Sequence, residues 1–295
     1  MMSHKYLWNL NTIQSVVGSV GRVRSYGLFF STLGLSVAVL TGCETVVTNP
    51  TSMMKSAQTP ADPKAAALAR TGLAADYIKN GDLDAAQRTL AKALESEPRL
   101  PEANNMMGVL LQRAGGEDNQ VKAEWYFKRA ISYKSDFAQA HNNYGVFLSS
   151  RKRYQEAYDQ FDIAGHQLGY YDRAAALENL GLTAEILGKQ AQAQDAFTQA
   201  LEVNRNSLVA RLELADIMLK QDRVQTARSL YDDYVRLSGD QPQSSRSLWI
   251  GMRIAQRTQD SGRLQFLAGR LELEYPNSPE CQRYHDLLKS GAAWN

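Results

Sequence analysis

Short runs of apolar and small residues at helical spacing alternate with polar breaks along most of this chain. The clearest unit spans residues 142–164. Residues 142–148 form a first helical run, residues 149–153 are a polar break, and a second helical run continues to Ala164. This pattern predicts two helices packed antiparallel as a hairpin. One hairpin cannot bury its own apolar faces, so neighbouring hairpins are expected.

The same unit recurs at a nearly fixed distance. Small residues equivalent to Gly145 follow one another in steps of 34, 37, 36 and 34 residues. A small residue is needed where two helices approach closely, and a large side chain follows in the second helix. The equivalent residues are Ala74, Gly108, Gly181 and Ala215 for Gly145; Ala86, Ala123, Ala193 and Ala227 for Ala157; Leu90, Phe127, Phe197 and Tyr231 for Phe161; and Ala93, Ala130 and Ala200 for Ala164, a series that Tyr234 breaks.

A basic period of 34 residues with this order of small and large side chains resembles the tetratricopeptide repeat, a helix–turn–helix unit. The resemblance implies an all-α fold in which the hairpins stack into a right-handed superhelical solenoid. Five registered copies and a degenerate one beginning near Leu248 predict about six hairpins, followed by a C-terminal helix over residues 278–289. We expect the solenoid to occupy residues 65–295.

Two of the copies are longer than the basic period. In the second copy, residues 115–120 are expected to lengthen the turn between the helices, which accounts for three extra residues. In the third copy, residues 169–172 add a further insertion. The first copy has a short turn at Gly81 and Asp82, and Asp82 is expected to cap the helix that follows.

The chain begins with a segment that predicts export. Residues 25–40 are apolar, follow two arginines, and are too short to cross a bilayer, which takes roughly 20 apolar residues. This is the pattern of a secretory signal. The sequence Leu40-Thr41-Gly42-Cys43 resembles the bacterial lipobox, in which the signal is removed before an acylated cysteine. We therefore expect a lipoprotein signal peptide at residues 1–42 and lipidation of Cys43; an uncleaved anchor helix with an incidental cysteine is the alternative.

The residues after Cys43 predict a flexible tether and a location. Residues 43–64 hold three X-Pro pairs among polar residues and few large apolar ones, so they cannot bury a core. Each buried acyl methylene contributes about 0.8 kcal/mol, and a second chain makes attachment to the membrane stable. In lipoproteins an aspartate directly after the cysteine favours the inner membrane. Here the residue is Glu44, which favours the outer membrane, with the chain lipid-anchored on its periplasmic side.

Charge and reactive residues argue against several functions. The chain has a formal charge of +2, but three basic and no acidic residues precede Cys43, which leaves 30 basic against 31 acidic residues beyond it. A nucleic-acid surface with a large basic excess is therefore not expected. No Cys-x-x-Cys or Gly-rich phosphate loop occurs, and we expect no catalytic residue, metal, cofactor or small-molecule substrate. The histidines, which are not spaced as metal ligands, are His4, His141, His166 and His285.

Together these features resemble the type IV pilus biogenesis lipoproteins of the PilF/PilW pilotin family. Beyond the lipobox, tether and six repeats, the resemblance rests on Asn142-Asn143-Tyr144-Gly145-x-Phe147-Leu148, Arg153-Tyr154-x-Glu156-Ala157 and Trp249-Ile250-Gly251-x-Arg253-Ile254-Ala255. It implies no enzyme but a protein partner, the secretin PilQ, which such lipoproteins escort to the outer membrane and assemble or stabilise. One alternative is a repeat lipoprotein that serves outer-membrane protein assembly or recruits cell-wall enzymes; another is a hydrolase whose site is scattered over the repeats.

A solenoid of this kind offers a binding surface, because its first helices line a concave face that takes extended segments or helices. Asparagine amides can pair with a partner's backbone, and valine and leucine offer apolar contact. The alternative is that the asparagines satisfy local backbone groups. The inward-facing positions expected to bind a protein partner are Asn105, Val109, Asn142, Val146, Glu178 and Leu182.

Overall fold

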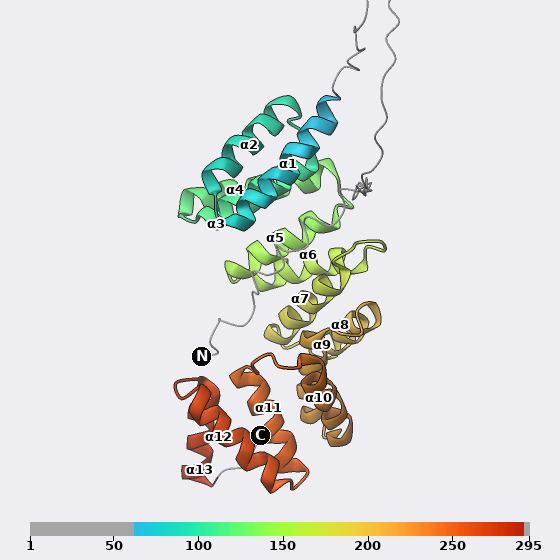
Figure 1. Cartoon of the computed structure of the whole chain (residues 1–295). Helices are drawn as coiled ribbons and strands as arrows, with labels where there is room; N and C mark the ends of the chain where they lie inside the picture. The colour runs from blue at the N-terminus through green and yellow to red at the C-terminus, as the bar shows by residue number, and fades with distance from the viewer. Residues whose placement is uncertain (1–61, 292–295) are drawn as a thin grey trace, which may run out of the picture.

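The computed structural model of the chain describes residues 62–291, and this part contains thirteen α-helices and no strand (Figure 1). The helices follow one another along the stack in chain order. The expected all-α tetratricopeptide solenoid is therefore confirmed. The helices are α1 (Pro63–Asn80), α2 (Leu83–Ser96), α3 (Pro101–Ala114), α4 (Glu117–Tyr133), α5 (Ala138–Ser150), α6 (Tyr154–His166), α7 (Arg173–Ile186), α8 (Gln190–Val203), α9 (Leu208–Lys220), α10 (Val224–Ser238), α11 (Ser245–Arg257), α12 (Ser261–Glu274) and α13 (Pro279–Ser290).

The first twelve helices pair as six hairpins, and α13 packs on the last hairpin. Helix α1 begins at Pro63, two residues earlier than expected, because the Asp62 carboxylate accepts a hydrogen bond from the Lys64 backbone N–H and caps the helix. The signal segment, Cys43 and the tether up to residue 61 lie outside the described residues. Within residues 62–291, no helix has both the length and the hydrophobicity that crossing a membrane takes.

A residue with positive φ occupies the same place in the turn of every hairpin. In the first hairpin this residue is Gly81, whose N–H bonds to the Ile78 carbonyl while the Asp82 N–H reaches the Tyr77 carbonyl. These bonds close α1 and reverse the chain. The Asp82 side chain then caps α2 by accepting from the Ala85 N–H over 3.0 Å, as the sequence predicts. The six turn residues are Gly81, Gly115, Lys152, Gly188, Asp222 and Gln259.

In hairpins two, three and four, an aromatic ring of the second helix lies on a glycine of the first helix. The rings are fully buried. A β-carbon in place of the glycine hydrogen would overlap the ring, so only glycine allows this approach. This contact explains why small and large residues recur at fixed spacing. The distances from such a β-carbon to the ring are 2.8 Å for Gly108 and Phe127, 2.6 Å for Gly145 and Phe161, and 2.6 Å for Gly181 and Phe197.

The sixth hairpin fills the same space with the sizes exchanged. Met252 stands seven positions before the turn residue, where the other hairpins have the small residue. Ala268 stands nine positions after it, where hairpins one, three, four and five have Leu90, Phe161, Phe197 and Tyr231. Both side chains are buried in one apolar cluster. Gly251, one position earlier, instead makes room for the Tyr231 side chain of the preceding hairpin. The exchange explains why the repeat pattern looks degenerate here.

The extra residues of the second repeat lie in a helix, and the expectation of a lengthened turn is wrong. Only Gly115 and Gly116 separate α3 from α4, which is 17 residues long. Glu117 and Asp118 stand in the first turn of α4, where negative charge is favourable at the positive end of the helix dipole. The insertion therefore extends α4 at its start. The expected insertion at residues 169–172 does lie in a loop, between α6 and α7.

Arginines of the last repeat join it to the repeat before. Arg253 Nη1 lies 2.6 Å from Asp216 Oδ1, and both side chains are nearly buried. Further pairs across this junction are Arg246 with Glu213 and Asp216, Arg257 with Asp222, and Arg263 with Asp232. A buried charge that loses its partner is strongly destabilising. The last junction therefore depends on ion pairs as well as on apolar packing.

Replacing Gly181 by alanine is expected to destabilise the protein by about 1–3 kcal/mol, because the added methyl group overlaps Phe197. Adding Phe197→Leu is expected to recover most of that loss, since Ala74 and Leu90 form this combination in the first hairpin. Urea unfolding measures both variants. As a control, Gly269→Ala in α12 is expected to be neutral or stabilising by up to about 1 kcal/mol, because nothing lies near its absent β-carbon. No recovery in the double variant would show that this contact does not set the helix spacing.

Replacing Arg253 by methionine is expected to speed amide hydrogen exchange in α11, α12 and α13, because Asp216 loses a buried partner. Breaking a buried pair costs roughly 3–5 kcal/mol, and the loss here is expected to be smaller because Arg246 and Lys220 still contact Asp216. The matched control is Arg257→Met, which removes an exposed pair worth less than about 1 kcal/mol. Equal exchange in the two variants would contradict this account of the junction.

Candidate protein-binding site

The first helices of the hairpins lie in successive layers of the stack (Figure 1). We call the surface formed by α3, α5, α7, α9 and α11 the first-helix face. The structure buries two of the predicted groove residues here, Asn105 and Asn142, with 1% and 2% of their surface exposed. The other four are half-buried, namely Val109, Val146, Leu182 and Glu178. The assignment of these six residues to a partner site stays a prediction.

Asparagine side chains bridge successive first helices. Asn143 Nδ2 donates to Asn105 Oδ1 over 3.2 Å, and Asn179 Nδ2 donates to Asn142 Oδ1 over 3.2 Å. We call these two bonds the amide rungs. They run between repeats instead of to local backbone, and they leave the buried asparagines as acceptors inside the stack. Each donor amide is half-buried and has a second N–H and a carbonyl oxygen of its own.

Asn143 and Asn179 are not among the six residues that the sequence predicts for the groove. A signal for them was present, because these two residues are separated by the same step of 36 residues as Gly145 and Gly181. The half-buried donors are more accessible at the surface than the buried acceptors.

Side chains from neighbouring loops fix two of the predicted groove residues. Tyr170, in the loop between α6 and α7, forms a hydrogen bond with Asn142, and burial raises the pKa of the Tyr170 hydroxyl well above its usual value. Ser207, just before α9, donates to Glu178 Oε1 over 2.6 Å. Burial also raises the pKa of the Glu178 carboxyl. The face on α5 and α7 is therefore already ordered without a partner.

An ionic network continues the first-helix face across α9 and α11. Asp216 is its centre, with Arg253 at 2.6 Å, Lys220 at 2.9 Å and Arg246 at 3.2 Å. Arg246 also donates from Nε to Glu213 Oε1 over 2.9 Å. Burial opposes the charge of Asp216, but the three cations hold the pKa of its carboxyl below the usual range.

Glu185 on α7 is the loosely paired member of this network. Its carboxylate lies 3.6 Å from Lys220 Nζ. Burial and the nearby Glu213 carboxylate raise the pKa of Glu185 to about 7. The carboxylates of Glu185, Glu213 and Asp216 lie within 4.8 Å of one another, a spacing that suits a metal ion. Because cations of the protein already contact this group, we assign no metal site to it.

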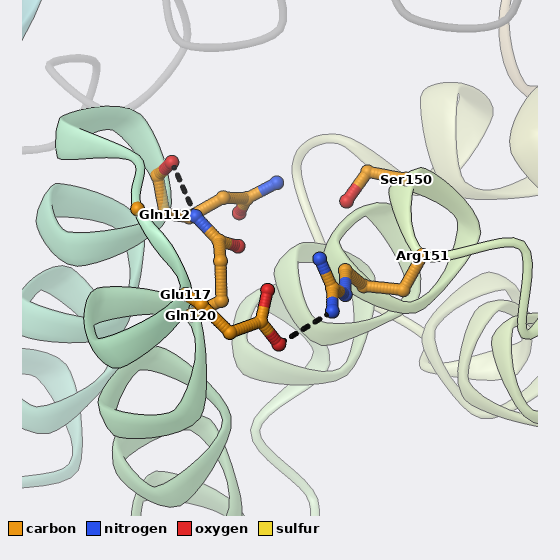
Figure 2. Close-up of a pocket in the computed structure, with 6 residues that line it drawn as sticks. Gln112, Glu117, Gln120, Ser150 and Arg151 are labelled. Atoms are coloured by element: carbon orange, nitrogen blue, oxygen red, sulfur yellow. Dashed lines mark hydrogen bonds and ion pairs between the residues drawn. The ribbon is translucent and has the colours of Figure 1, made fainter.

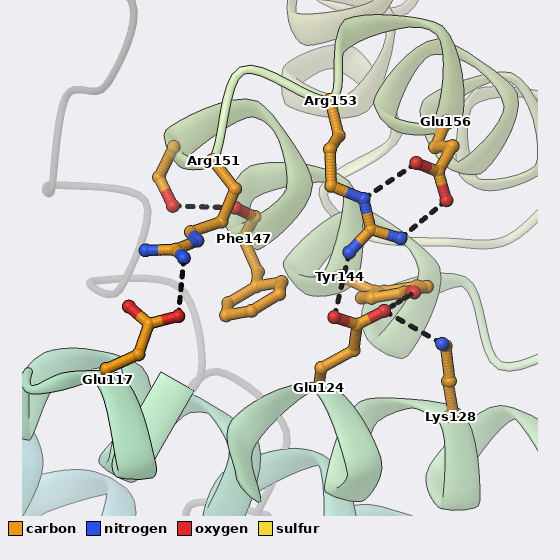
Figure 3. Close-up of polar contacts among 9 residues, drawn as sticks. Glu117, Glu124, Lys128, Tyr144, Phe147, Arg151, Arg153 and Glu156 are labelled. Carbon is orange, nitrogen blue, oxygen red and sulfur yellow. Dashed lines mark hydrogen bonds and ion pairs between the residues drawn. The ribbon is translucent and has the colours of Figure 1, made fainter. Parts of the chain in front are cut away.

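Arg153 braces the second and third hairpins against each other (Figure 3). Its Nη1 lies 2.8 Å from Glu124 Oε2 on α4, and its Nε and Nη2 each lie 2.6 Å from Glu156. Glu124 also accepts from the Tyr144 hydroxyl over 2.9 Å and from Lys128 over 2.8 Å. Burial opposes ionisation, but these three donors lower the pKa of Glu124 to about 2. The Arg153-Tyr154-x-Glu156 element therefore has a structural role beside the face.

A polar hollow of about 450 Å³ lies between the start of α4 and the end of α5 (Figure 2). Arg151 reaches across it to Glu117, with Nη2 and Oε1 2.8 Å apart. Gln120 donates from Nε2 to the Gln112 carbonyl over 3.1 Å. These contacts join Arg151 to Glu117 and Gln120 to the backbone of α3.

A larger cleft of about 750 Å³ lies between α2 and the second hairpin. Its lining includes the buried Met107 and the half-buried Leu94 and Tyr126, while the exposed Asp84 and Lys122 stand beside them. Apolar lining with a few charged groups suits the apolar side of a peptide or helix. The cleft is therefore a second candidate surface for a protein segment.

Two further residues that the sequence singles out make local contacts. The buried His141 ring has its nitrogens 2.8 Å from Gln160 Oε1 and 3.0 Å from the Ser135 carbonyl oxygen. Trp125 is 51% exposed, and the Arg129 guanidinium stacks 4.3 Å from the centre of its ring. Both residues therefore serve packing and surface contacts.

The chain is similar to a known protein over nearly the whole length of that protein. The chain is 32% identical over 262 residues to the type IV pilus assembly protein PilF of Pseudomonas aeruginosa, which covers 89% of this chain and 98% of that protein. An uncharacterised protein of Haemophilus influenzae is 30% identical over 137 residues, or 46% of this chain and 73% of that protein. A tetratricopeptide-repeat family model matches residues 187–246.

Solved structures agree with the sequence match. The structure of Pseudomonas aeruginosa PilF superposes with a TM-score of 0.69 at 32% identity, covering 76% of this chain and 98% of that chain. The crystal structure of PilW, a widely conserved type IV pilus biogenesis factor, superposes with a TM-score of 0.61 at 25% identity, covering 74% and 97%. With its repeats, its fold and nearly the full length of PilF matched, the chain belongs to the PilF family of tetratricopeptide-repeat proteins of type IV pilus biogenesis.

Proposed function

We propose that this protein is an outer-membrane lipoprotein that acts as a pilotin, localising the PilQ secretin and assembling or stabilising its ring. The match over 98% of PilF carries the proposal. The lipobox supports it, because an acylated Cys43 anchors the chain to the membrane on its periplasmic side. Residues 44–61 then separate the lipid from α1, and an extended chain of that length reaches up to roughly 60 Å.

The first-helix face is the proposed docking surface for a PilQ segment. Asn143 and Asn179 offer amide groups to a partner's backbone, while Val146 and Leu182 offer apolar contact. Because the amide rungs and the neighbouring loops already hold this face, few side chains lose freedom when a partner binds. Pre-organisation of this kind lowers the cost of association.

The proposed role is binding without catalysis. The carboxylates of Asp216 and Glu213 contact cations, and the His141 ring is held by Gln160 and the Ser135 carbonyl. None of these groups is poised as an acid, base or nucleophile. We therefore propose no cofactor and no small-molecule substrate.

Replacing Cys43 by alanine is expected to leave the fold intact but to remove the protein from the outer membrane. In a strain that lacks the native copy, the wild-type chain is expected to restore PilQ multimers and the Cys43→Ala variant to restore markedly fewer. Membrane fractionation and immunoblots of PilQ multimers measure both effects. Cys281→Ala is the matched control, because Cys281 is buried in α13. Outer-membrane retention of the Cys43 variant would contradict the lipid anchor, and normal PilQ multimers without the chain would contradict the pilotin role.

Replacing Asn143 and Asn179 together by alanine is expected to weaken binding of purified PilQ by roughly 5- to 100-fold, since each lost hydrogen bond contributes about 0.5–1.5 kcal/mol. Surface plasmon resonance measures the change. Asn206→Ala, at an exposed loop position, is the control and is expected to bind normally. Thermal melting checks that the double variant is folded, because its rungs are lost. Unchanged affinity in a folded double variant would exclude this face as the PilQ site.

A further inference from the structure

In every hairpin after the first, the first helix receives the second helix of the preceding hairpin at two fixed positions. These stand eight and twelve residues before the turn residue with positive φ. In α3, α5, α7 and α9, side chains at these positions are at most 7% exposed. The residues are Met107 and Ala103, Tyr144 and Ala140, Leu180 and Ala176, and Leu214 and Ala210.

The same two positions in α1 are exposed. They hold Leu73, with 47% of its surface exposed, and Ala69. Leu68 beside them is 39% exposed, and a β-carbon added to Gly72 would meet no atom within 4 Å. We call these four residues the α1 face. A terminal repeat of a stack normally turns a polar side to water, so an apolar receiving surface at this end indicates a missing partner.

The internal junctions show what such a surface receives. At the position of Leu73, the Tyr144 ring packs 5.9 Å from the Phe127 ring of the preceding second helix. At the position of Ala69, Ala103 packs with Ala93 and Ala176 packs with Ala164. Each of these alanines of the second helix stands three residues after the large residue of that helix. The helix that fits therefore carries a large apolar residue followed by alanine three positions later.

The carboxylate of Asp76 calls for a basic residue in the docked helix. It stands five residues before the turn residue, where the later first helices have the buried Leu110, Phe147, Thr183, Ile217 and Ile254. Phe147 stands at this position in α5, and its ring lies 5.7 Å from the Phe127 ring. In a helix docked on α1, Asp76 would therefore face the N-terminal side of the large apolar residue that corresponds to Phe127. A lysine or arginine about one turn before that residue would pair with the carboxylate.

We propose that the α1 face docks a helix of a protein partner, with a basic residue, a large apolar residue one turn later and alanine three positions beyond. This continues the interface that already joins the chain's own repeats. A second copy of α1 does not carry this pattern, because Thr71 and Asp76, not alanine, stand three positions after Leu68 and Leu73. A lipid surface would bury Asp76 without a counter-charge. The site is separate from the first-helix face and does not depend on what that face binds.

The test places the photo-crosslinking residue p-benzoylphenylalanine at position 73 of the full-length chain in living cells. The matched control carries the probe at Leu288, an exposed leucine of α13. Position 73 is expected to give at least about tenfold more protein adduct than position 288, the ratio that about 1.4 kcal/mol of contact free energy produces. Mass spectrometry identifies the captured peptide, which is expected to have the helical pattern proposed above.

A second set of full-length variants tests the face itself. With the probe at position 68, Leu73→Asp is expected to lower the same adduct about tenfold or more, while Leu288→Asp leaves it unchanged. Adducts with lipid, with this chain's own N-terminal segment or a second copy, or with peptides lacking the pattern overturn the proposal. The absence of any adduct at position 73 overturns it as well.

Discussion

A phenylalanine ring lying on a glycine fixes how closely the two helices of hairpins two to four approach each other. Every hairpin reverses at an equivalent residue with positive φ, so the contact falls at the same height in each layer and the layers stack in one register. That register sets Asn143 beside Asn105 and Asn179 beside Asn142. The half-buried amides of Asn143 and Asn179 are therefore positioned by core packing. A change at a buried ring position is therefore expected to shift these amides through the same register.

The types of residue that pack the junctions between repeats change from the first repeat to the last. Alanine, leucine and phenylalanine pack the early junctions, whereas at the last junction Tyr231 lies over Gly251 with its hydroxyl buried and unpaired among the described residues. Burying such a hydroxyl costs free energy, and the same junction also holds the Arg253 pair with Asp216. Helix α13 covers this end with the buried Cys281, while α1 leaves the other end apolar and exposed. The open end is the N-terminal one, which in the proposed lipoprotein is connected through residues 44–61 to the acylated Cys43.

The sequence predicts most of this fold because the packing contact repeats at a fixed spacing and involves glycine and aromatic residues. It misplaces the insertion of the second repeat, because residues 115–120 begin with two glycines while the following acidic residues also favour a helix start. It selects the buried Asn105 and Asn142 over their half-buried partners, because helical periodicity alone does not distinguish adjacent amides at the edge of a face. It misses the pairing of Arg253 with Asp216, since the two stand 37 residues apart and no local pattern links them.

The two halves of the first-helix face differ in what a partner must exchange to bind. In the ionic network, the carboxylates and cations already form ion pairs. A charged group of a partner must break one of these pairs to form its own, so the net gain in binding free energy is small. The half-buried amides of Asn143 and Asn179 exchange only hydrogen bonds to water for hydrogen bonds to a partner's backbone. In the proposed docking surface, the amide half is therefore expected to contribute more to affinity than the ionic network. Glu185 is the exception within the network. Its pKa is about 7, so protonating its carboxylate near neutral pH costs little free energy. When Glu185 is neutral, Lys220 keeps its ion pair with Asp216.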